Sequence, residues 1–211
     1  MKIQIKDKLK TVELYKQYLK KKSLELFIID CNGNKPLPRF GHSLVMIDSS
    51  NACLFGGVVV TNINNEYTYS NDTYIYRIIS RTWIKINFNQ KDSILPCERA
   101  AHTAAVNDNK QMVIYEGSNK FGLADDKLWI LNLGDQNEGI WSEIKTIGPT
   151  PGPRYGHSLI FLKPFFVLFG GEISLNKNLA NELWIINVKN SFCKWEKANL
   201  ENNNIIPCSR V

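Results

Sequence analysis

The chain has 211 residues, of which 44% are hydrophobic and 22% charged, so it is long enough and apolar enough to bury a sizeable core. No apolar run reaches the ~18 residues of a spanning helix, which excludes a membrane-spanning protein. The net charge is +6, and residues 1–22 account for all of it, with eight lysines against two acids. Residues 23–211 are therefore neutral, which argues against nucleic acid as a partner.

The cysteine pattern points to a reducing compartment. The five cysteines are an odd number without any C-x-x-C spacing, which fits neither a disulfide framework nor a four-cysteine zinc site. We therefore expect an intracellular protein, in the cytoplasm, the nucleus or both.

The first predicted element is a short amphipathic helix within residues 1–22, because Leu9, Val12, Tyr15 and Leu19 recur at near-helical spacing among the lysines. Such a helix could contact an acidic surface or partner weakly, or it could be a solvated helix packed on the side of the domain. Residues 23–35 follow as an apolar strand and a linker.

An internal repeat organises the rest of the chain. Arginine is followed three residues later by histidine in three places, and the arginines are separated by 60 and 55 residues. The pairs are Arg39 and His42, Arg99 and His102, and Arg154 and His157. With a fourth arginine at position 210, the repeat divides the chain into units 36–95, 96–150 and 151–206, with a further unit starting at 207–211.

Each unit carries further landmarks in the same order. A hydrophobic run ends at a glycine pair, which unit 2 replaces by Glu116-Gly117; then an acidic or amide pair precedes an aromatic residue, and a tryptophan closes the unit. The glycines are Gly56, Gly57, Gly117, Gly170 and Gly171, and the closing residues are Trp83, Trp141 and Trp195. Turn residues between the runs predict four short antiparallel strands per unit. Because one such sheet cannot bury both faces alone, the units should stack as blades of an all-β propeller.

The order Arg-x-Gly-His, Gly-Gly, Asn-Asp-x-aromatic and Trp resembles the kelch repeat from about residue 36 to the end. Residues 98–105 and 149–157 are similar to the N-terminal kelch region of kelch-like Ser/Thr protein phosphatases. That resemblance implies a two-metal phosphatase domain elsewhere in the parent protein. The three metal-binding segments of such a domain are missing here, so we expect neither catalytic residues nor a cofactor or metal in this chain.

The repeated residues have structural and functional interpretations. Histidines at equivalent points of different blades should lie around a ring, so buried hydrogen-bonding roles are favoured over a metal site or a catalytic base. The glycine pairs are better explained by close backbone packing than by phosphate binding, since no P-loop pattern follows them. The tryptophans are favoured as packing between blades over stacking platforms for bases or sugars. Residues 23–30 fall where a unit-ending strand would, so we expect them to complete the last blade.

Strand alternation places the long loops on one face of the propeller, where recognition is usual. The candidate binding residues on this face are Tyr67, Tyr69, Asn119, Lys120, Phe121, Asn176 and Lys177. The alternative is that these Asn-rich loops are only solvated insertions.

The leading functional hypothesis is a module that recognises a protein or peptide partner, as the non-catalytic kelch part of a Ser/Thr phosphatase. The alternative is a stand-alone kelch scaffold or adaptor, and a catalytic propeller is the least supported reading. Closed propellers typically have about 4–8 blades. Three blades therefore call for further sequence or a second copy, so self-association is an open option.

Overall fold

The computed structural model describes residues 29–61, 66–88, 94–134, 138–173, 178–188 and 192–198. The chain divides into two compact units, 1–30 and 31–211, and every strand of the described residues belongs to the second. The regular elements of the described residues are all strands, which confirms the all-β class, and no helix among them could cross a membrane. The predicted helix in 1–22, most of the predicted strand at 23–30 and the start of the fourth unit at 207–211 lie outside the described residues.

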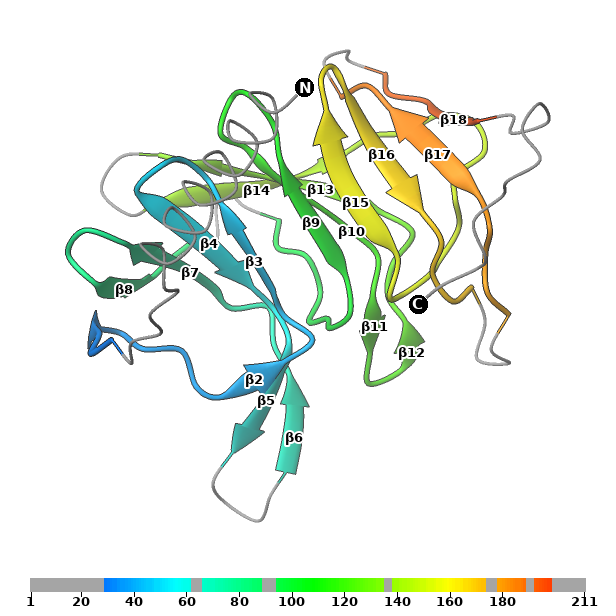
Figure 1. The fold of residues 1–211 in the computed structure, drawn as a ribbon. Helices are drawn as coiled ribbons and strands as arrows, with labels where there is room; N and C mark the ends of the chain where they lie inside the picture. Colours follow the sequence, from blue (N-terminus) through cyan, green and yellow to red (C-terminus); the bar gives the residue numbers. More distant parts are fainter. Residues whose placement is uncertain are drawn as a thin grey trace, which may run out of the picture. The chain divides into compact units, whose positions relative to one another are not determined.

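Three blades of four antiparallel strands follow one another along the chain, as expected for a propeller (Figure 1). The sheet of blade 1 has a fifth strand, β1 (Asn32–Gly33), which is parallel to its neighbour. Blade 1 contains β3 (Ser43–Met46), β4 (Asn51–Phe55), β7 (Thr73–Arg77) and β8 (Thr82–Lys85). Blade 2 contains β9 (Thr103–Val106), β10 (Met112–Tyr115), β13 (Leu128–Leu133) and β14 (Gly139–Ile144). Blade 3 contains β15 (Ser158–Leu162), β16 (Phe165–Phe169), β17 (Leu183–Ile186) and β18 (Trp195–Lys197). In each blade, neighbours in sequence are neighbours in the sheet.

Side-chain hydrogen bonds shape the turns between the first two strands of the blades. The Asp48 carboxylate accepts hydrogen bonds from the backbone N–H groups of Ser50 and Asn51. In blade 2, the Asn107 side chain accepts from the N–H groups of Asn109 and Gln111. These Asx-type contacts explain why Asp and Asn mark the predicted turns.

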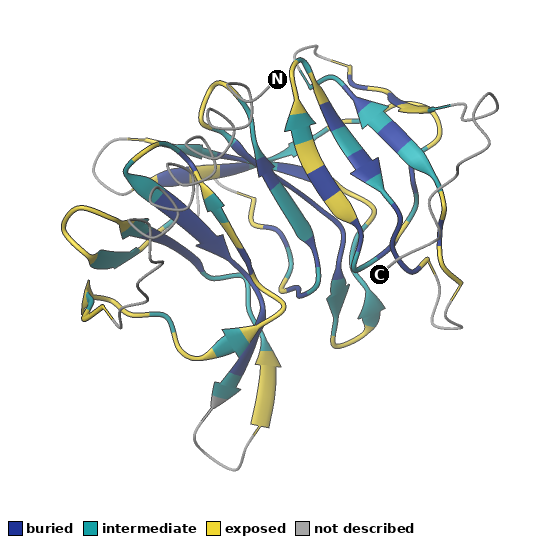
Figure 2. Cartoon of the chain, in the orientation of Figure 1, coloured by how far each residue is buried: buried dark blue, intermediate teal, exposed yellow. Residues whose placement is uncertain are grey.

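Blade 2 buries both of its faces because its strand residues alternate between two cores. Met112 and Ile114 of β10 belong to the core shared with blade 1, while Val113 and Tyr115 belong to the core shared with blade 3. Every residue of β10 is buried, which is the dark blue class of Figure 2. Trp141 is buried in the first of these cores and Trp195 in the second, which supports their predicted packing role. Trp83 differs, since it packs against two tyrosines of its own blade, Tyr74 and Tyr76.

The chain that leaves the outer strands of blades 1 and 2 is paired with the next blade. Asn87 after β8 pairs in parallel with Glu138 before β14, and Thr146 after β14 pairs in parallel with Cys193. The short strand β1 (Asn32–Gly33) makes the same parallel pairing with β8. Asn32 thus occupies the position that, in blades 1 and 2, is taken by the residue just after the outer strand. The outer strand expected at 23–30 would end just before this position, and it remains a prediction.

Two of the expected long loops contain hairpins. The first combines β2 (Arg39–Phe40), β5 (Val58–Thr61) and β6 (Glu66–Tyr69), and the second combines β11 (Ser118–Asn119) and β12 (Gly122–Leu123). Both project from the lower side of the view in Figure 1. The run Val58-Val59-Val60-Thr61 is β-branched throughout, and this explains why the first loop is extended and not irregular.

Candidate functional site

The hairpins and the described residues of the corresponding blade 3 connection form the surface that we call the hairpin face, defined by residues 39–40, 58–61, 66–70, 118–124, 172–173 and 178–180. Tyr67 lies on β6 with 66% of its surface exposed, and its ring contacts that of Phe40, which is 55% exposed. The two rings meet edge to face, with centroids 6.1 Å apart. Tyr69, two residues further along β6, is half-buried. An exposed aromatic pair on a strand edge is a typical protein-binding feature.

The β11–β12 hairpin presents the most exposed aromatic ring of this face. Phe121 at its tip is 86% exposed, and the Lys120 ammonium lies 4.9 Å from the centre of that ring. The Asn119 side chain accepts a hydrogen bond from the Phe121 N–H at 2.8 Å, which fixes the turn. The predicted group Asn119, Lys120 and Phe121 therefore forms one ordered tip.

In blade 3, the predicted residues Asn176 and Lys177 lie outside the described residues. The chain on either side of them is paired, because Glu172 forms an antiparallel bridge with Leu179 and the Ile173 N–H donates to the Asn178 carbonyl. Ile173 and Leu179 are both partly exposed. Described residues thus add apolar surface to the hairpin face in blade 3 as well.

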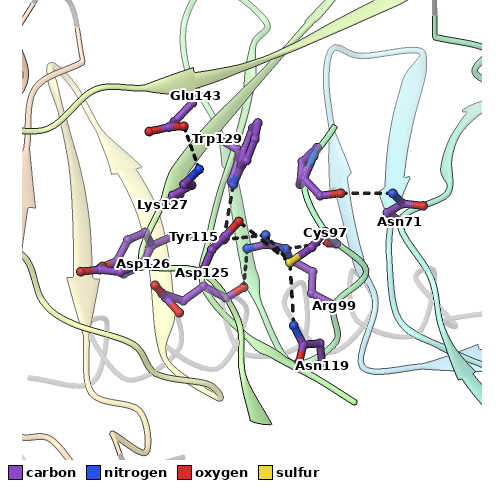
Figure 3. Close-up of polar contacts among 12 residues, drawn as sticks. Asn71, Cys97, Arg99, Tyr115, Asn119, Asp125, Asp126, Lys127, Trp129 and Glu143 are labelled. Carbon is purple, nitrogen blue, oxygen red and sulfur yellow. Dashed lines mark hydrogen bonds and ion pairs between the residues drawn. The ribbon is translucent and has the colours of Figure 1, made fainter. Parts of the chain in front are cut away.

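The repeated arginine fastens both ends of each hairpin or loop to its blade. Arg99 is fully buried, and its guanidinium donates to the Glu116 carbonyl at the end of β10 and to the Asp125 carboxylate before β13. Figure 3 shows Asp125 directed at Arg99, with the Trp129 indole on its other side. Arg39 and Arg154 make the equivalent contacts, to the carbonyls of Gly56 and Gly170 and to the acids Asp72 and Glu182. We call this arrangement the arginine clamp; it lets a rigid blade display a loop of variable length.

Each blade has a second ion pair beside the clamp, and in blade 2 the positions of its acidic and basic residues are exchanged. In blade 1, Lys85 of β8 pairs with Asp72 at 2.6 Å, and in blade 3 Lys197 of β18 pairs with Glu182. In blade 2 the outer strand carries the acid instead, and Glu143 pairs with Lys127 at 3.1 Å (Figure 3). The lysine nevertheless lies over the equivalent aromatic ring each time, 5.7 Å from Tyr74, 5.7 Å from Trp129 and 5.9 Å from Trp184.

The histidines join successive blades. His102 shares a 2.8 Å hydrogen bond with the Ser43 hydroxyl of blade 1, and His157 shares a 2.6 Å bond with the Thr103 hydroxyl of blade 2. Burial and then the charge of the neighbouring arginine, Arg99 or Arg154, lower the pKa of each ring to about 3. Both are therefore neutral near pH 7, and their arrangement is structural. Among the described residues, no group of three or more His, Cys, Asp or Glu side chains could hold a metal ion.

Sequence reasoning missed two features of the surface. The first is the exposed ring of Phe40, which lies within the Arg-His motif and was therefore counted as part of the repeat. The sequence could have indicated it, because blade 2 has Ala100 at the equivalent position. Cavities of about 500 and 530 Å³ also open between blades 1 and 2 and between blades 2 and 3, beside the short turns. Ion pairs from Lys110 to Asp48 and from Lys163 to Asp108 link these turns. No sequence pattern marks such cavities, since each forms only when two blades meet.

The family of the chain follows from comparison with known proteins. Residues 4–211 match the model of the KLHDC2/KLHL20/DRC7 Kelch-repeats domain. The chain belongs to the kelch-repeat family. It also resembles the solved structure of YjhT, with a TM-score of 0.60 at 16% sequence identity, over 79% of this chain and 53% of that one. This likeness supports the propeller fold.

Curated relatives of this kelch-repeat chain are much longer proteins. It is 32% identical over 158 residues to the leucine-zipper-like transcriptional regulator 1 homolog of Drosophila melanogaster, covering 74% of this chain and 15% of that protein. It is 34% identical over 158 residues to human host cell factor 1, covering 68% and 7%. It is 28% identical over 138 residues to the serine/threonine-protein phosphatase BSL2 of Arabidopsis thaliana, covering 65% and 13%. The chain thus spans a small part of each relative.

Proposed function

We propose that this kelch domain recognises a protein or peptide partner through the hairpin face. The observation that carries the proposal is the group of exposed aromatic rings, Phe40, Tyr67 and Phe121, on hairpins that the arginine clamps hold. Aromatic side chains lose little conformational entropy on binding and dominate binding energy at interfaces, provided that the backbone beneath them is already ordered.

The finer proposal is that the domain selects substrates or regulators for an attached Ser/Thr protein phosphatase. The 28% identity to the phosphatase BSL2 supports it, together with the residues in 98–105 and 149–157 that resemble that family. The alternative is a scaffold or adaptor without an enzyme, favoured by the relatives whose names indicate no phosphatase. The presence or absence of the three two-metal phosphatase segments in the full-length protein distinguishes the two. In either case we propose an intracellular site of action.

The binding proposal is tested by capture of partners from an extract of the source cells, followed by affinity measurement with the purified partner. Tyr67→Ala and Phe121→Ser should each weaken binding by about 2 kcal/mol, or ~30-fold, if the rings are binding hot spots. Ile79→Ser is the matched control, because Ile79 is as exposed as Phe121 but lies on the turn between β7 and β8. Equal affinity of the wild type and both aromatic variants would rule out the hairpin face.

A further inference from the structure

Blade 2 carries a glutamate where the other blades carry the first glycine of the pair. Glu116 follows β10 with a φ of +53°, and the equivalent Gly56 and Gly170 have φ values of +69° and +75°. This left-handed conformation suits glycine and strains other residues. At Gly56 a side chain would start 2.7 Å from the Arg99 carbonyl and 3.0 Å from the His102 ring. By the repeat, the Glu116 side chain leaves the backbone toward Arg154 and His157 of blade 3.

The Glu116 carboxyl group is buried without an ion-pair partner among the described residues. The residue is 0% exposed, and neither carboxyl oxygen has a hydrogen-bond partner among the described residues. Asp126 and Asp125, on the connection from β12 to β13, both oppose a negative charge there. Burial and these acids raise the pKa of Glu116 to about 10, so the group carries a proton in the folded state at neutral pH.

The cations nearest to Glu116 are already engaged. The Arg99 guanidinium is paired with Asp125, and that of Arg154 donates to backbone carbonyls and to Glu182. The charge of Arg99 and the backbone N–H of Arg154 both favour the ionised carboxyl group, but neither guanidinium forms an ion pair with it. The remaining titratable neighbours are neutral: the Tyr115 hydroxyl donates to Asp126, and the His157 ring lies against Tyr115. Burial and the two aspartates outweigh the groups that favour ionisation, so the pKa of Glu116 stays raised.

We propose that the junction between blades 2 and 3 is a proton-linked hinge, which stays closed while Glu116 is protonated and releases that proton to solvent when it opens. An exposed carboxyl group ionises above its ordinary pKa of 4.5. Opening followed by ionisation therefore becomes tenfold more favourable per pH unit between that value and about 10.

The hinge lies at the base of the hairpin face. The Gly117 N–H donates to the Arg154 carbonyl across the junction, and the Gly117 carbonyl accepts from the Ala124 N–H below the β11–β12 hairpin. Opening the junction breaks the first bond and separates Phe121 from the blade 3 loop. A rise in pH thus loosens one side of the hairpin face, independently of which partner binds there.

Two buried thiols report on the two junctions separately. Cys193 lies in the core between blades 2 and 3, and Cys53 lies in the core between blades 1 and 2, where the glycine pair is intact. We label the protein with a low concentration of iodoacetamide and follow each cysteine peptide by mass spectrometry. This gives a labelling rate for each thiol in the same sample. The ratio of the two rates cancels the ordinary pH dependence of thiol reactivity, since both thiols react from solvent-exposed states.

The ratio of Cys193 to Cys53 labelling should rise about tenfold per pH unit from pH 6.5 to 8.5 in the wild type. Glu116→Gln keeps the size of the side chain but cannot ionise, and Glu116→Gly restores the glycine pair; the ratio should be independent of pH in both. Circular dichroism checks that each variant folds, and either variant alone suffices for the comparison. A wild-type ratio that does not change with pH, or an equal slope in Glu116→Gln, would overturn the hinge.

Discussion

Acidification from pH 6.5 to about pH 5 should destabilise the protein through His102 and His157. Each ring has a pKa near 3 when folded, against an ordinary value of 6.5, because burial and an adjacent arginine disfavour its charged form. The unfolded chain therefore binds more protons below pH 6.5, so the stabilisation present above this pH is lost as the pH falls. A change of 1.5 pH units costs about 2 kcal/mol per histidine, or about 4 kcal/mol for both.

Glu116 acts in the opposite direction over the same interval. Its pKa is raised on folding, so its cost to stability shrinks as the pH falls toward 4.5. Glu116 therefore raises the free energy of unfolding by about 2 kcal/mol between pH 6.5 and 5. Together with the two histidines, the expected net loss of stability in the wild type is about 2 kcal/mol. Above pH 6.5 only the Glu116 effect remains among these three groups, so stability should be highest near pH 6.5.

Urea unfolding followed by tryptophan fluorescence measures this dependence at each pH. His102→Gln and His157→Gln should each remove about 2 kcal/mol of the acid-induced loss. His42→Gln is the control, because His42 is exposed. Partial burial and Arg39 lower the pKa of His42 as well, so this variant should remove a smaller part of the loss than the other two. If acidification costs His102→Gln as much as the wild type, or if His42→Gln reduces the loss equally, the assignment to the buried rings is wrong.

Two further substitutions test the packing of blade 2. Gly117→Ala would place a methyl group 2.6 Å from the Ala100 carbonyl at a φ of +113°, and a loss of about 2–4 kcal/mol is expected in urea unfolding. Lys127→Glu and Glu143→Lys should each lower the free energy of unfolding by about 0.5–1 kcal/mol, because each breaks the ion pair between the two side chains. In a double-mutant cycle the double variant should recover most of that loss, since its ion pair has the same polarity as those of the other blades. Additive single effects in the cycle would mean that the pair contributes nothing.

The blade architecture was predictable because it depends on spacings that each unit repeats. Arg99, its histidine and its glycine mark where strands begin and end, and their hydrogen bonds are made within one blade or to its neighbour. The packing role of Trp141 and Trp195 was predictable for the same reason. Trp83 occupies the same repeat position but packs against two tyrosines of its own blade. The repeat therefore predicts where a side chain lies in the blade, but not which residues pack against it.

The details of the candidate site were less accessible to sequence reasoning. The aromatic pair of Phe40 and Tyr67 joins residues 27 positions apart in sequence, and among the described residues only blade 1 makes this contact. The unpartnered carboxyl of Glu116 was visible only as a departure from the glycine pair. Its energetic meaning depends on burial and on Asp126, which no local pattern reports.

The reversed ion pair of blade 2 bears on how the chain assembles. Similar repeats in one chain can exchange strands during folding, a common failure of repeat proteins. An exchange of outer strands with blade 2 would place Lys127 opposite Lys85 or Lys197, and Glu143 opposite Asp72 or Glu182, so each such wrong pairing brings like charges together. The same three lysines and three acids that stabilise the correct blades thus mark blade 2 as different from its neighbours, and they favour its own outer strand over those of the other two.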